Sequence, residues 1–301
     1  MSSFSFDRFC KTFRWLLSVN RLVLLGVSSG CAVSMFLLEM VTLILYSEPS
    51  GYIRNVAGFM TFGILVLALV YVSGLFTSLT SIGSKQQRTN FLMLPASNLE
   101  KFLALMVFVT LAGLVISTVS FILGDLLRMG VLAVWNQFHP LQGVSYYPDG
   151  DNMVYTYWWS SALPHVWNNF IPKFFVSETY QYPMLHQVMY VLSALLFAVW
   201  VHSSYALGGS LLRKYSFVVT TLILILCVMA FAYFMHKTEM SLFPSVWRDN
   251  HYVSQEVGPM AYVLCVLFIV FSCFNYWASF RIFKGFQIIT NKWTNYDILK
   301  R

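Results

Sequence analysis

The sequence predicts an all-α polytopic membrane protein with six transmembrane helices. Of its 301 residues, 58% are hydrophobic and only 10% are charged, whereas a soluble domain carries about 25% charged residues. Six apolar runs are long enough to cross a hydrocarbon core of about 30 Å, which requires roughly 20 helical residues. The basic residues are also distributed unevenly among the segments that join these runs. These observations exclude a soluble cytosolic enzyme, a disordered chain and a nucleic-acid-binding domain.

The six apolar runs form one predicted membrane domain over residues 22–280. They cover residues 22–46, 56–82, 102–123, 184–207, 217–236 and 257–280. The fourth run is the weakest, because His186, Gln187 and His202 interrupt it. An even number of spans places both termini on the same side of the membrane.

The positions of Lys and Arg orient the spans, because cytoplasmic segments carry an excess of basic residues. With both termini inside, 14 of the 19 basic residues are cytoplasmic. These 14 are Arg8, Lys11, Arg14, Arg21, Lys85, Arg88, Lys101, Arg213, Lys214, Arg281, Lys284, Lys292, Lys300 and Arg301. Both termini are therefore expected in the cytoplasm, and the net charge of +7 is explained by the membrane rather than by a nucleic acid.

Two segments outside the spans have the pattern of amphipathic helices that lie in the inner membrane interface. In residues 1–21, Phe6, Phe9 and Phe13 share a helical face, with basic residues elsewhere on the helix. In the tail, residues 281–301, Phe283 and Phe286 repeat this arrangement. A third segment, residues 125–183, is predicted to be a long outer loop rich in tryptophan, tyrosine and proline.

The loop between the second and third spans, residues 83–101, predicts a short cytoplasmic helix. Ser97 and Glu100 form the S-x-x-E pattern of a capping box, which starts the helix of the third span. A short helix held between two spans could present a rigid surface to a soluble partner. Candidate contacts are Lys85, Gln87, Arg88, Phe91 and Leu92. An ordinary capped loop is the alternative.

Polar or small residues within the spans are further candidates. Glu39 is an acid within the first span, where a charge costs about 3 kcal/mol or more, so it is a candidate for a substrate pathway. The alternatives are solvation at the outer interface and neutralisation by protonation. Asp125, followed by Arg128, could bind a polar substrate group or form a charge pair at a helix end. Gly26 and Gly30 form a GxxxG pattern, which suits packing within one chain or a dimer contact.

The sequence contains neither an ATP-binding loop motif nor a zinc-protease motif. It lacks GxxxxGK[ST] and HExxH, and its six histidines show no spacing of metal ligands. We therefore expect no catalytic, cofactor-binding or metal-binding residue on this chain. A membrane sensor or scaffold that binds a ligand through the aromatic loop is the main alternative to transport. An intramembrane enzyme using His186, His202 and Glu39, or a proton-coupled carrier, are weaker alternatives.

The pattern resembles the membrane subunit of a type-2 ABC exporter. The resemblance rests on the amphipathic segment before the first span, the six spans and the short helix between spans two and three. The shaped outer segment before the last span, residues 237–256, also fits. The strings LPASNLEKF (residues 94–102) and RIFKGFQII (residues 281–289) look like those of Bacteroidetes-type permeases.

This resemblance implies a function that the residues alone do not establish. Residues 85–94 would form the coupling helix that inserts into a separate ATPase subunit, which would bind ATP and Mg. A second permease copy, identical or different, would complete the transporter in a bacterial inner membrane. The substrate path would run between the paired first, second and fifth spans. The long aromatic loop between spans three and four departs from the pattern of the class.

Overall fold

A computed structural model describes residues 4–46, 48–74, 85–140, 145–149, 152–170, 184–212, 214–248, 251–254 and 257–285. The chain divides into two compact units. Unit 1 comprises Met1–Asn20, Leu69–Thr110 and Val176–Arg301, and unit 2 comprises Arg21–Ala68 and Leu111–Phe175. The sequence predicts one membrane domain, so this division by packing is an addition to that prediction.

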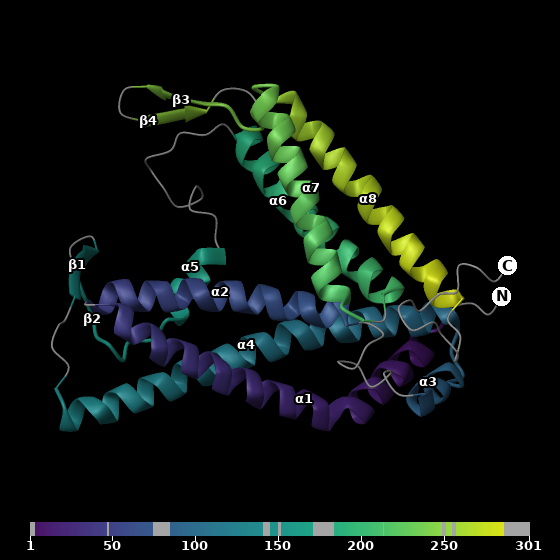
Figure 1. Ribbon diagram of the computed structural model, residues 1–301, viewed down its shortest axis with the longest axis horizontal. Helices are drawn as coiled ribbons and strands as arrows, with labels where there is room; N and C mark the ends of the chain where they lie inside the picture. The colour runs from purple at the N-terminus through teal and green to yellow at the C-terminus, as the bar shows by residue number, and fades with distance from the viewer. Residues whose placement is uncertain are drawn as a thin grey trace. The chain divides into compact units, whose positions relative to one another are not determined.

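Helices account for most of the described residues (Figure 1). They are α1 (Phe6–Thr42), the short 3₁₀ helix η1 (Leu43–Leu45), α2 (Pro49–Ser73), α3 (Lys85–Leu92), α4 (Asn98–Phe138), α5 (Leu163–Phe170), α6 (Met184–Leu211), α7 (Ser216–Lys237) and α8 (Pro259–Lys284). Six of them, α1 with η1, α2, α4, α6, α7 and α8, are long and apolar enough to cross a membrane. The chain is therefore a multi-pass membrane protein with the predicted number of spans.

Two antiparallel β-hairpins accompany the helices. Strands β1 (Ser145–Asp149) and β2 (Asn152–Thr156) pair with Ser145 opposite Thr156. Strands β3 (Ser245–Arg248) and β4 (His251–Ser254) pair with Ser245 opposite Ser254. The second hairpin lies in the segment before the last span, which the sequence singled out as a shaped outer segment.

Helices α1 and α4 begin or end at other residues than the sequence predicted. α1 runs without a break from Phe6 to Thr42, so the N-terminal segment and the first span form one continuous helix. α4 continues to Phe138, which makes it about 60 Å long, so residues 125–138 are helical and the aromatic loop begins later than expected. The predicted tail helix is represented only by the end of α8, because residues 286–301 lie outside the described part of the chain.

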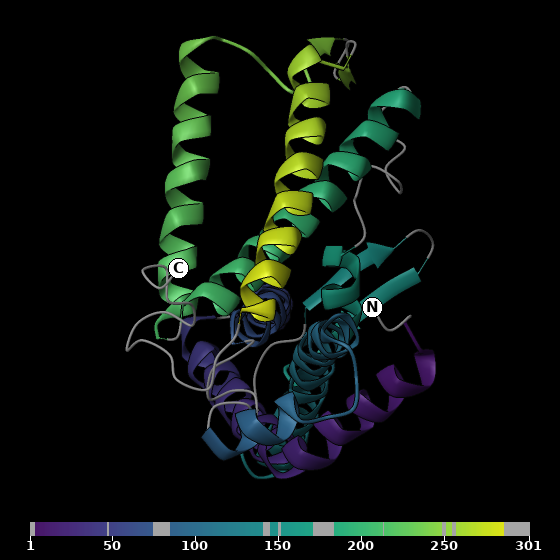
Figure 2. The same cartoon turned by 90° about the vertical axis from the view of Figure 1, so that its right-hand side faces the viewer.

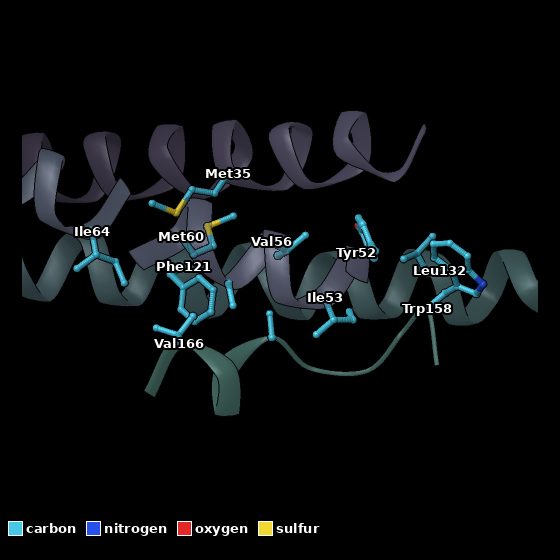
Figure 3. Close-up of a cluster of buried hydrophobic side chains, with 12 residues drawn as sticks. Met35, Tyr52, Ile53, Val56, Met60, Ile64, Phe121, Leu132, Trp158 and Val166 are labelled. Carbon is cyan, nitrogen blue, oxygen red and sulfur yellow. The ribbon is translucent and has the colours of Figure 1, made fainter. Parts of the chain in front are cut away.

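The core of unit 2 is formed by side chains from α1, α2, α4, α5 and the segment before α5. Figure 3 shows Tyr52, Leu132 and Trp158 gathered at one end of this core and Met60, Phe121 and Val166 farther along it. Tyr52, on α2, has no exposed surface, and Phe121, on α4, is 1% exposed. These contacts hold the segment between β2 and α5 against the helices.

In unit 1, α6 packs against both α7 and α8 (Figure 1). Two glycines allow close approach: a Cβ at Gly208 would collide with Thr220 of α7, and one at Gly209 would collide with the backbone of Ser73. Small residues let helix backbones come together in this way. The sequence patterns did not single out this glycine pair.

Candidate functional site

The short helix α3 is anchored to unit 1 by a buried aromatic side chain. Phe91 is 1% exposed, and its ring centroid lies 5.9 Å from that of Trp15 on α1 and 6.3 Å from that of Phe283 on α8. Figures 1 and 2 both place α3 beside the first part of α1. Phe102 at the start of α4 extends the aromatic contact, with its centroid 5.5 Å from that of Phe283. α3 is thus packed against the ends of two long helices.

Hydrogen bonds connect α3 to the start of α4. The Lys101 Nζ donates to the carbonyl of Leu92 at 2.6 Å, which satisfies a backbone oxygen at the end of α3. The predicted capping box is confirmed: the Glu100 N–H donates to Ser97 Oγ at 3.2 Å, and the Ser97 N–H donates to Glu100 Oε2 at 2.7 Å. The turn between the two helices is therefore held at both ends.

Glu100 also connects α4 to the beginning of α1. Its side chain is fully buried and accepts hydrogen bonds from the Ser5 N–H at 2.7 Å and from Arg8 Nη2 at 2.8 Å. Charge-assisted hydrogen bonds of this kind are stronger than neutral ones. The sequence predicted the cap by Glu100 but not its partner Arg8, because 92 residues separate the two.

The predicted docking residues of α3 differ in their environment. Phe91 was predicted to contact a partner, but in this structure its side chain is buried within unit 1. Gln87 and Leu92 are half-buried, and for Lys85 and Arg88 the described part is the helical backbone. The residues that the pattern missed are exposed: Gln86, Asn90 and Met93, of which Met93 is 77% exposed.

Unit 2 contains a buried charge cluster, which consists of Glu39, Asp125 and Arg128. Arg128 on α4 has no exposed surface. Its Nε lies 3.0 Å from Glu39 Oε2 on α1, and its Nη2 lies 2.6 Å from Asp125 Oδ1, one turn earlier on α4. Its carbon Cζ lies 5.7 Å from the centre of the Tyr52 ring on α2.

Arg128 and Asp125 also hold the segment Tyr157–Ala162, which leads into α5. Arg128 Nη1 donates to the carbonyl of Trp158 at 2.8 Å and Nη2 donates to that of Ser160 at 2.5 Å. Ser161 Oγ and the Ala162 N–H donate to Asp125 Oδ2 at 2.8 and 3.2 Å. Asp125 and Arg128 therefore bind this chain segment. Their charge pair, predicted at a helix end, is buried in the middle part of α4.

Glu39 is less well paired than Asp125. Its side chain is 1% exposed, yet among the described residues neither of its carboxylate oxygens has a hydrogen-bond partner. Its ion pair with Arg128 replaces the expected solvation at the outer interface. A buried charge normally requires both an ion partner and hydrogen bonds. The carboxyl group of Glu39 is therefore buried without a hydrogen bond to another described residue.

Close packing of α1 and α4 surrounds Glu39. A Cβ at Gly124 would lie 3.2 Å from the Cβ of Met35 and 3.4 Å from Glu39 Oε1. At Gly26 and Gly30, by contrast, a Cβ would meet no atom within 4 Å in the described part of the chain. Among the described residues the GxxxG pattern therefore makes no close contact, whereas Gly124 does.

The aromatic loop is in part a structural element. Trp158 is 7% exposed and belongs to the core of unit 2, while Tyr157 and Trp159 stack with ring centroids 5.1 Å apart. Nearby on α5, His165 is half-buried; burial and the charge of Arg54 lower its pKa. Trp158 is consequently not accessible to an external ligand.

A cavity of about 740 Å³ lies among α6, α7 and α8 in unit 1. Its lining is mainly apolar and includes Phe197, Trp200 and Phe268. Its polar members include Ser193, Ser204, Thr220 and Asn275. Such a lining suits an apolar chain better than an ion.

The intramembrane histidines contribute to packing in unit 1. His202 contacts Thr110 Oγ1 at 3.0 Å and Tyr276 Oη at 2.7 Å, and His186 packs on Phe243. Glu39 belongs to unit 2, whereas both histidines belong to unit 1. Within the described ranges, no three His, Cys, Asp or Glu side chains form a group suited to a metal ion.

Comparison of the chain with protein-family models, with curated proteins and with solved structures found no match.

Proposed function

We propose that this chain is the membrane subunit of an ABC-type exporter and that α3 binds a separate ATPase subunit. One observation carries the proposal: α3 is a short helix between two spans, with one side anchored by Phe91 and Lys101 and other positions exposed. A flexible loop would change shape when a bound partner moves. A helix that is packed against other helices moves them when it is itself moved.

The anchoring contacts define which helices would move with α3. Phe91 connects it to α1 and α8, Lys101 connects it to α4, and the Glu100–Arg8 pair ties α4 to α1. ATP binding would close two ATPase subunits and pull on α3, so that these helices shift between two packed arrangements. ATP and Mg would be bound by the partner, and this chain would perform no covalent chemistry.

The charge distribution supports the orientation that this function requires. The segments that flank α3 and both termini contain most of the basic residues, which favours the cytoplasmic side of a bacterial inner membrane. A second permease copy would complete the substrate path. The direction of transport and the exporter assignment rest on the resemblance of the sequence to type-2 exporters.

The proposal is tested with a charge placed at Met93, the exposed residue that directly follows α3. The tagged full-length chain is purified from its native membrane, and co-purifying ATPase activity and the identity of the bound subunit are measured. Met93→Glu is expected to reduce that activity at least tenfold, because a new carboxylate would be buried at the interface. Met240→Glu is the matched control, since Met240 is also exposed but lies between α7 and β3.

The outcomes separate the proposed function from its alternative. Loss of a nucleotide-binding subunit with Met93→Glu but not with Met240→Glu supports docking on α3. If neither the unaltered chain nor the control retains an ATPase, the transport proposal fails and the sensor or scaffold function is favoured. If both variants retain it equally, α3 is not the docking element.

A further inference from the structure

We propose that Glu39 is a proton-binding site and that its bound proton keeps the segment Tyr157–Ala162 attached to the charge cluster. This inference concerns unit 2 alone and does not depend on the function proposed for α3. It rests on the count of charges in the cluster, on the hydrogen bonds of its two carboxyl groups, and on the space around Glu39.

The charge cluster has more negative than positive groups. Glu39 and Asp125 face a single guanidinium, that of Arg128, and none of the three residues is more than 3% exposed. With both acids ionised, the cluster would carry one uncompensated negative charge. A buried uncompensated charge is so costly that the group normally takes up a proton instead. One added positive charge makes the cluster neutral.

The hydrogen bonds indicate which of the two acids carries the proton. Asp125 accepts hydrogen bonds from Arg128, Ser161 and the Ala162 N–H, all of which favour its ionised form. Glu39 has only the ion pair with Arg128, and both of its oxygens lack a hydrogen-bond partner in the described structure. The proton therefore belongs on Glu39.

The space around Glu39 favours a proton over a larger cation. Oε1 faces Gly124 so closely that a single added Cβ would lie 3.4 Å away. A Na⁺-like or divalent ion needs several oxygen ligands around it, and no group of three acidic or metal-binding side chains occurs in the described ranges.

Loss of the proton would change what Arg128 binds. An ionised Glu39 competes for the guanidinium N–H groups that now donate to the carbonyls of Trp158 and Ser160. These carbonyls connect Tyr157–Ala162 to α4, so proton release loosens this segment. Besides Asp125 and Arg128, Tyr52 on α2 is the titratable group that interacts with Glu39 in the described structure. His165 on α5 follows Ala162 by three residues and interacts with Arg54 on α2.

Hydrogen exchange of the purified full-length chain in nanodiscs tests this inference. Protection factors, which remove the intrinsic pH dependence of exchange, are measured for peptides covering residues 157–166 from roughly pH 6.5 to 9.5, well above the ordinary range of a carboxyl group. We expect protection to fall at least tenfold as the pH rises in the unaltered chain. With Glu39→Gln, which mimics the protonated form, we expect high protection at every pH.

A second measurement detects the proton itself and does not depend on exchange. Infrared spectra of the unaltered chain at neutral pH should contain the carbonyl band of a protonated, buried carboxyl group, and Glu39→Gln should remove it. His165→Gln is the control for the neighbouring titratable group and should leave both the band and the pH dependence intact. The inference is overturned if the band survives Glu39→Gln, or if Glu39→Gln shows the same pH-dependent loss of protection as the unaltered chain. Neither readout involves an ATPase, so its failure is distinguishable from failure of docking on α3.

Discussion

At the scale of single residues, Arg128 is the side chain on which the most other groups depend. It binds two carboxylates and two backbone carbonyls from a fully buried position. Removing one member of a buried ion pair leaves the other charge unpaired and costs about 3–5 kcal/mol. We therefore expect Arg128→Met to lower the free energy of unfolding by roughly that amount, measured by denaturant titration in detergent micelles.

The exposed pair of Lys11 and Asp7 provides the matched control for Arg128. Their side chains are 73% and 70% exposed and lie 2.6 Å apart on one face of α1. Such exposed pairs contribute about 0.5 kcal/mol or less, so Lys11→Met should leave the unfolding free energy nearly unchanged. Equal effects of Lys11→Met and Arg128→Met would show that burial does not determine the strength of the charge cluster.

At the scale of elements, the attachment of α3 depends on Phe91. Truncating a buried phenylalanine costs about 3–5 kcal/mol where the structure cannot collapse around the cavity. We expect Phe91→Ala to leave the six spans folded but to reduce the hydrogen-exchange protection of residues 85–92 to that of an isolated eight-residue helix, which is too short to be stable alone. Met93→Ala, at a position 77% exposed, should not change this protection. Unchanged protection with Phe91→Ala would mean that other contacts hold the helix.

The elements also show which features are readable from sequence. The capping box of Ser97 and Glu100 was predicted because its hydrogen bonds join residues three positions apart. The end of α4 was misplaced because Asp125 and Arg128 resemble a polar helix end when their partners are unknown. Asp125 pairs with Arg128 within α4, and Glu39 of α1, 89 positions away, contacts Arg128 as well, so the helix continues through these polar residues. Partners at such separations leave no local pattern.

At the scale of the whole molecule, composition predicted the six spans but not their grouping. Apolar runs of about 20 residues follow directly from the thickness of the membrane, and all six coincide with long apolar helices. The division into two compact units depends on which helix faces pack together, as at Gly208 against Thr220 and at Gly124 against Met35. Glycine is common in membrane helices, so its position alone did not identify these contacts.

The orientation of the chain in the membrane is the broadest prediction. Three long apolar helices, α4, α6 and α7, separate Asn90 from Met240, and both side chains are exposed. An odd number of crossings puts the two positions on opposite sides, and the positive-inside rule puts Asn90 in the cytoplasm. In a variant without the five native cysteines, Met240→Cys should react with a membrane-impermeant maleimide in spheroplasts, whereas Asn90→Cys should react only after the membrane is opened. The reverse labelling pattern would show that the chain has the opposite orientation in the membrane. In that orientation α3 could not contact a cytoplasmic ATPase. Labelling of both positions from the same side would mean that one of the three helices does not cross.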